Sequence, residues 1–156
     1  MIDKKEILRE LRDKFEKAKK DLDFNLSFDE LNNLFFLEDS ILSIGFVAEN
    51  FPRQIRFIIG NNFDKWISYL NDLLYPQSNS LTLQTEAKVF SSSDDKKLIW
   101  DLITKMMKLN SLGFFAELKN DKSLQKKFIT ESYDFWKKEL SSLIRIIERT
   151  HESWSK

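Results

Sequence analysis

The chain has 156 residues, with 25 Lys and Arg against 25 Asp and Glu, one His and no Cys. The formal net charge of zero excludes the simplest nucleic-acid-binding proteins, in which an overall excess of cations supplies most of the affinity. Without Cys there are no disulfides, no cysteine-ligated metal centre and no thiol nucleophile. An apolar content of 42% with three Gly and two Pro predicts one helical domain over residues 1–156.

The charged N-terminal segment predicts a first helix over residues 4–22. Asp3 and Glu6 have the spacing of a capping box. The apolar positions that follow recur at the spacing of a helix with one narrow apolar stripe: Leu8, Leu11, Phe15, Ala18 and Leu22. No secretory leader is expected here, and no apolar run approaches the ~20 residues that span a bilayer, so we expect a cytoplasmic protein with no membrane contact.

A second capping box, at Ser27 and Glu30, predicts a helix over residues 27–49. Its apolar residues occupy nearly the whole circumference, which is typical of a helix covered by its neighbours. We therefore expect it at the centre of an all-α bundle of five to six helices. Pro52 suits the first turn of a third helix, which continues to residue 74.

Residues 75–93 have no helical period, so we expect an irregular connection there. Ser93 caps a fourth helix that is expected to fade near Asn110. The last helix is expected from Ser123 to about Trp154, because apolar residues repeat there in a heptad pattern that predicts shallow, coiled-coil-like packing. Those positions are Ile129, Tyr133, Trp136, Leu140, Leu143, Ile147, Thr150 and Trp154.

Some apolar residues suggest a contact surface for another protein. A Trp at the end of a long helix needs something to cover it, either the same chain or a second copy. Two adjacent Met residues, with Phe114 and Phe115 nearby, form either ordinary core or an adaptable docking surface, since Met repacks easily. The residues predicted for the interaction surface are Trp154, Ile147, Met106 and Met107.

The only histidine is the first candidate for catalysis. His151 follows Arg145 with five residues between them. This spacing resembles the Arg-x(4–6)-His motif of the HEPN family of small all-α ribonucleases, over seven residues and the fold class. The resemblance implies that Arg145 and His151 meet, usually across a dimer, and promote attack by the RNA 2′-hydroxyl without a metal. A solvent-facing His near a helix C-terminus is the simpler interpretation.

Two other pairs have the residue types of a metal site. Glu148 lies three residues before the histidine, as in helical di-metal bundles, but those need a second such motif, and the chain has no second His. Glu38 and Asp39 are paired acids of the kind that bind Mg²⁺ with phosphates. Alternatively, they line a polar edge or pair with Arg53 or Arg56. We expect no metal and no cofactor.

The lysines gather in two groups, in the first helix and around the start of the last. Acids interleave both groups, which is typical of a solvated helix surface, although one basic stripe for RNA would result if the groups meet in space. The groups are Lys14, Lys17, Lys19 and Lys20, and Lys119, Lys122, Lys126 and Lys127. The sequence thus favours a non-catalytic protein-interaction or assembly module. The alternatives are a HEPN-like ribonuclease and a small helical subunit of an RNA-bound complex.

Overall fold

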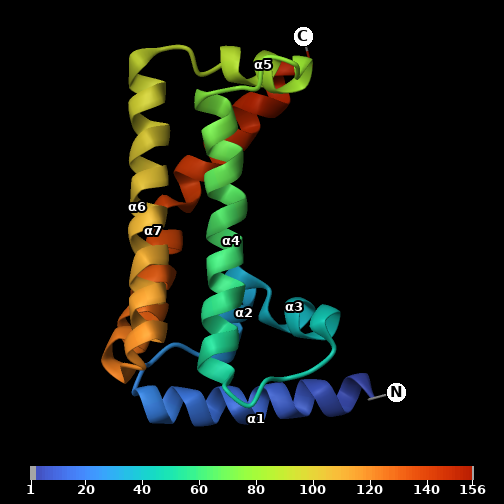
Figure 1. Ribbon diagram of the computed structural model, residues 1–156. Helices are drawn as coiled ribbons and strands as arrows, with labels where there is room; N and C mark the ends of the chain where they lie inside the picture. Colours follow the sequence, from blue (N-terminus) through green and yellow to red (C-terminus); the bar gives the residue numbers. More distant parts are fainter. Residues whose placement is uncertain (1–2, 156) are drawn as a thin grey trace. The chain divides into compact units, whose positions relative to one another are not determined.

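The computed structural model of the protein describes residues 3–155, and every regular element in that range is an α-helix (Figure 1). The prediction of an all-α fold is confirmed, whereas the predicted number of helices is slightly too low. Within residues 3–155, no helix combines the length and apolar character needed to cross a membrane. The helices are α1 Lys4–Leu22, α2 Phe28–Phe35, α3 Leu37–Ile44, α4 Phe51–Leu74, α5 Leu81–Lys88, α6 Ser93–Lys119 and α7 Lys122–Ser153.

The first two helices begin at side-chain caps. Asp3 Oδ1 accepts a hydrogen bond from Lys5 N at 3.1 Å, and α1 then follows the predicted span. At α2 the capping box is complete: Ser27 Oγ accepts from Glu30 N at 3.1 Å, and Glu30 Oε2 accepts from Ser27 N at 2.8 Å. These bonds pair backbone donors that the first turn of a helix leaves free.

The single central helix predicted over residues 27–49 is wrong. The chain breaks at Phe36, which adopts a left-handed conformation with φ 53°, so that α2 and α3 are separate helices. Asn32 Oδ1 accepts from Glu38 N at 2.8 Å across the break. The left-handed conformation is unusual for an aromatic residue. Nothing in the local sequence signals it, because the apolar residues continue through it.

Two further boundaries differ from the prediction. The connection predicted as irregular over residues 75–93 contains α5, whose start is capped by Ser80 Oγ accepting from Leu83 N at 3.2 Å. No residue of α5 is buried, so no apolar period marks it. Helix α6 continues past Asn110 to Lys119, through positions that are poor helix formers in isolation.

The heptad pattern of α7 is half right. Every second predicted position is buried: Ile129, Trp136, Leu143 and Thr150. Between them Phe135 is also buried, and so are Ser132, Glu139 and Ile146, each of which lies one position before an expected apolar residue. The buried face still repeats at heptad spacing, but polar side chains occupy part of it. The prediction used apolar character alone and therefore chose some residues one position away from the buried ones.

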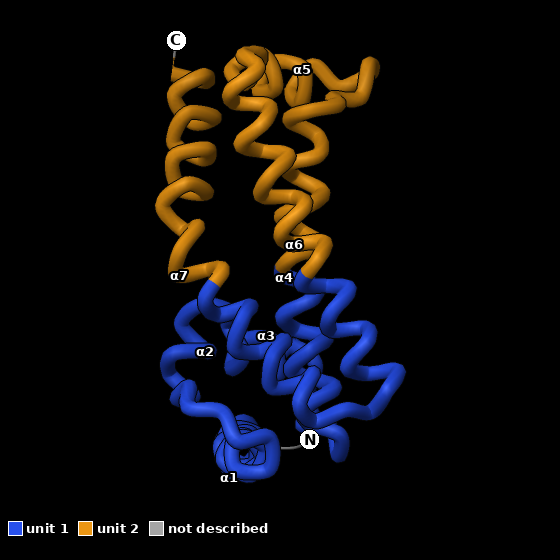
Figure 2. The backbone as a smooth tube through the Cα atoms, turned by 90° about the vertical axis from the view of Figure 1, so that its left-hand side faces the viewer, with its two compact units in different colours: residues 1–62, 109–134 blue, residues 63–108, 135–156 orange. Residues whose placement is uncertain are grey.

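The chain divides into two compact units (Figure 2). Unit 1 comprises residues 1–62 and 109–134, and unit 2 comprises residues 63–108 and 135–156. In unit 1, α1 contacts α2 and α3, and Phe15 packs edge-on against two other core rings at centroid distances of 5.3 and 5.8 Å. Unit 2 has its own core, which includes Phe63, Leu70, Phe90, Ile99, Leu102, Met106, Phe135, Trp136, Leu143 and Ile146.

Candidate functional site

Unit 1 contains an open groove with a volume of about 730 Å³. One wall is the first two turns of α4, and the other is the C-terminal part of α6. The end of α3 and the loop over residues 45–50 close the side between them. The apolar residues that line the groove are Ile44, Phe46, Ala48, Phe57, Phe114 and Leu118.

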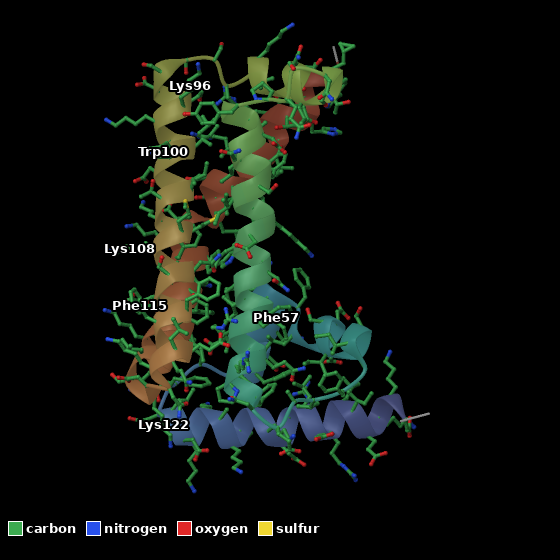
Figure 3. The ribbon with its side chains drawn as sticks, viewed as in Figure 1. Phe57, Lys96, Trp100, Lys108, Phe115 and Lys122 are labelled. Atoms are coloured by element: carbon green, nitrogen blue, oxygen red, sulfur yellow. The ribbon has the colours of Figure 1, made fainter. Side chains whose placement is uncertain are left out.

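Large apolar side chains in this groove are exposed to solvent. Phe46, Phe57 and Phe114 have exposed fractions of 54%, 51% and 55%, and Leu118 is 83% exposed. Single exposed apolar residues are common on protein surfaces, but a cluster in a concave site is typical of a binding surface. Phe57 is labelled on α4 in Figure 3. The groove is therefore the strongest candidate for a functional site in unit 1.

The loop that presents Phe46 is held by hydrogen bonds from two directions. Gln54 is buried, and its Oε1 accepts from Ala48 N at 2.8 Å while its Nε2 donates to Phe46 O at 3.2 Å. From α1, Lys14 Nζ donates to Ala48 O at 3.1 Å. Val47 packs into the core between these anchors. The backbone that carries Phe46 is thus held in place, and its exposed side chain lines the groove.

Two arginines share one carboxylate beside the apolar wall. Glu117 Oε1 lies 2.6 Å from Arg53 Nε, and Glu117 Oε2 lies 2.5 Å from Arg56 Nε. The Arg56 guanidinium also lies over the Phe114 ring, 5.0 Å from its centroid. Among the ion pairs of residues 3–155, neither arginine has a second carboxylate. The cluster therefore has one positive charge in excess, next to the N-terminus of α4, where the helix dipole is also positive.

A glycine allows the helices around this cluster to approach one another. A Cβ atom at Gly113 would lie 3.1 Å from Phe128 Cε2 and 3.2 Å from Arg56 Cγ, closer than ordinary van der Waals contact. The missing side chain therefore lets Arg56 of α4 and Phe128 of α7 pack directly on α6. The sequence signal was a glycine inside an otherwise helical segment, which often marks such an approach.

The residues predicted as an interaction surface lie elsewhere. Met106 is fully buried in unit 2, while Met107 and Ile147 are exposed. Trp154 is also exposed, and its Nε1 donates to Glu86 Oε1 at 3.0 Å. None of the four lines the groove. A contact surface on α7 stays a prediction, and its best candidate, Trp154, already has a partner in its own unit.

The two ribonuclease candidates are both exposed to solvent, but their side chains do not come together. Arg145 and His151 are both exposed on α7, and six helical residues separate their directions by about 120°. No hydrogen bond or ion pair of the described residues joins their side chains. Within unit 2 they do not form a catalytic pair, so the HEPN-like activity would need a second chain to supply one of them.

The candidate metal-binding residues either pair with another side chain or lack the further ligands that a metal ion requires. Among residues 3–155, no three His, Asp or Glu side chains come close enough to hold a metal ion. Glu38 Oε2 lies 3.8 Å from Arg12 Nη2, rather than pairing with Arg53 or Arg56 as the sequence suggested. The local sequence could not reveal this, because Arg12 reaches Glu38 from α1.

The two lysine groups both belong to unit 1, and acids accompany them. Lys126 Nζ lies 3.5 Å from Asp23 Oδ2, where α7 begins near the end of α1. Lys127 Nζ lies 3.8 Å from Glu131 Oε1, and Lys14 holds the loop described above. These pairs are consistent with a mixed, solvated surface.

Comparison of the chain with protein-family models, with curated proteins and with solved structures found no match. The function of the groove therefore has to be inferred from its own residues. Sequence analysis had noted Phe114 and Phe115, and Arg53 only as an alternative partner of an acid at position 38 or 39, but it had assigned neither Phe46 nor Phe57 to a site. No local pattern connects these residues, because separate helices bring them together.

Proposed function

We propose that this protein is a non-catalytic interaction module that binds a partner protein in the groove of unit 1. The observation that carries the proposal is the gathering of exposed Phe46, Phe57, Phe114 and Leu118 around one concave site. Aromatic residues and Arg are enriched at the centres of protein interfaces, where a few buried anchors supply most of the binding energy. The close packing at Gly113 and the hydrogen-bonded loop over residues 45–50 hold the residues of the site in place.

A preformed site favours binding for a further reason. Ordering a loop or side chain on association costs free energy that reduces affinity. Because Gln54 and Lys14 already fix the loop over residues 45–50, that cost is small here. Phe46 then contributes its apolar surface nearly in full.

Two adjacent phenylalanines of α6 provide a matched test. Phe114 lines the groove, whereas Phe115 is equally exposed and points to the outer side of the helix (Figure 3). A photo-crosslinking phenylalanine analogue at position 114 should trap a partner in an extract of the source cells, and at position 115 it should not. For the trapped partner, Phe114→Ala should weaken binding by about tenfold or more, and Phe115→Ala by less than about twofold.

Equal effects of the two substitutions would contradict docking in the groove. Sedimentation of the free chain separates partner binding from self-association, since only the latter changes with the concentration of the chain alone. If Phe114→Ala leaves every interaction unchanged while Trp154→Ala removes one, the α7 surface replaces the groove as the interaction site.

A further inference from the structure

The electrostatics of the groove indicate which kind of partner it takes, and this inference rests on the proposed function. We infer that the occupant is an amphipathic helix of a partner protein that carries an Asp or Glu at the edge of its apolar face. The apolar side chains would contact Phe46, Phe57 and Phe114, and the carboxylate would pair with Arg53.

The walls of the groove suit a helix. Its two long sides are helices; on α6 the apolar residues Phe114 and Leu118 recur at helical spacing, and α4 contributes Phe57 opposite them. A third helix laid between two others packs its side chains into the grooves between their ridges. Amphipathic helices bind apolar grooves in this way, with anchors at i, i+3 or i+4, and i+7.

The charge of the groove requires an acid on that helix. An apolar segment alone would remove water from Arg53, whose side chain is 67% exposed, while Glu117 remains shared with Arg56. Covering an incompletely paired guanidinium is unfavourable. An incoming carboxylate restores two anions for two cations, so that Arg53 pairs with the partner and Arg56 keeps Glu117. A Lys or Arg at the same position would be repelled.

This positive charge is local. Unit 1 as a whole has more Asp and Glu than Lys and Arg, so it does not attract polyanions in general. The selection of an acid therefore depends on Arg53, supported by the positive N-terminal end of α4. An exposed guanidinium beside apolar surface recognises a single carboxylate better than a phosphate backbone, which needs many spread cations.

The test selects 16-residue peptides from a random displayed library on the full chain, after removing those that also bind Phe114→Ala. We expect apolar anchors at helical spacing and an enriched Asp or Glu. In synthetic copies, replacing that acid by Gln should weaken binding about tenfold, and by Lys further. On Arg53→Glu the preference should reverse toward Lys or Arg, and on Arg53→Gln it should disappear. Phe115→Ala is the matched control and should bind like the parent.

The outcomes separate the two proposals. Peptides that need Phe114 but show no acid preference, or whose preference survives both Arg53 substitutions, overturn the acidic helix and leave the groove as a docking site. If no binding peptide remains once those that also bind Phe114→Ala are removed, the proposed function itself fails. Arg53 is exposed, so both of its variants should keep the helical circular dichroism of the parent, which confirms that a lost preference is not lost folding.

Discussion

The two units each contain an arginine, a carboxylate and a phenyl ring in contact, but the two clusters differ in how completely they are paired. In unit 2, Arg149 donates to both oxygens of Asp95, at 2.6 and 2.9 Å, and to Val89 O at 2.8 Å. Its guanidinium lies over the fully buried Phe90 ring, 4.6 Å from the centroid. In unit 1, two arginines share Glu117, and the stacked ring, Phe114, is exposed.

The comparison shows that the same three residue types can either stabilise the fold or form part of an exposed binding site. One cation against one carboxylate, over a buried ring, leaves nothing for a partner to pair with. Two cations against one carboxylate, beside an exposed ring, leave charge and apolar surface together. The hydrogen bonds from Arg149 hold the pKa of Asp95 below its ordinary value, as a structural ion pair does.

The largest expected effect contrasts the two rings. Phe90→Ala removes a fully buried side chain and should lower the free energy of unfolding by about 3–5 kcal/mol. Phe114→Ala removes an exposed ring and should change it by less than about 1 kcal/mol. Urea denaturation followed by circular dichroism measures both. Similar losses in the two variants would mean that the groove ring is structural and would remove the contrast between the units.

The next effect concerns the glycine beneath the groove. Gly113→Ala should lower the free energy of unfolding by about 1–3 kcal/mol, because the new methyl group presses on Phe128 and Arg56. Gly60→Ala is the matched control: its Cβ would lie 3.5 Å from Asn110 Oδ1, an ordinary contact, so better helix propensity should raise stability by up to about 1 kcal/mol. A Gly113 variant as stable as the parent would show that the close approach does not constrain the site.

A smaller effect depends on pH and tests the pairing of Asp95 with Arg149 in unit 2. Because the folded pKa of Asp95 is lowered, its pairing stabilises the protein at pH values above the ordinary Asp pKa of about 4 and is lost as pH falls through the lowered value. Asp95→Asn should therefore cost about 1–2 kcal/mol near pH 7, since the pair is partly exposed, and the difference from the parent should shrink in acid. A difference as large in acid as at pH 7 would contradict this assignment.

The smallest effect on stability is expected at the end of α7. Trp154→Ala removes an exposed ring and its hydrogen bond to Glu86, which should change the free energy of unfolding by no more than about 0.5–1 kcal/mol. If the groove is the docking site, the same substitution should leave peptide binding unchanged. Weaker self-association in light scattering would instead give α7 a contact role of its own.

The elements that could be predicted are those whose buried residues repeat regularly along one face. Helix α1 matches its predicted span, and α7 begins and ends within one residue of it, because buried residues repeat along both. The break at Phe36 could not be predicted, since its left-handed backbone leaves the apolar pattern intact. Helix α5 has no buried residue and therefore no pattern to find.

The groove was harder to predict than the helices. Its walls come from α4 and α6, and the phase of α6 decides that Phe114 faces the groove while Phe115 does not. Which side of α6 each residue occupies depends on the continuation of the helix to Lys119, whereas sequence analysis had expected it to fade near Asn110. Sequence analysis considered Arg53 only as an alternative partner for Glu38 or Asp39, because only the folded chain brings Glu117 to it.

The hydrogen bonds that hold the loop over residues 45–50 have a consequence for the rate of association. Because Phe46 is held in place before a partner arrives, no slow closing step should precede contact, and association should follow a single exponential whose rate rises linearly with partner concentration. Salt would then act mainly on the association rate, through Arg53, whereas truncation of Phe57 or Phe114 would act mainly on dissociation. Removing the hydrogen bonds that hold the loop, as in Gln54→Ala, would add a loop-ordering step. The observed association rate would then level off at high partner concentration.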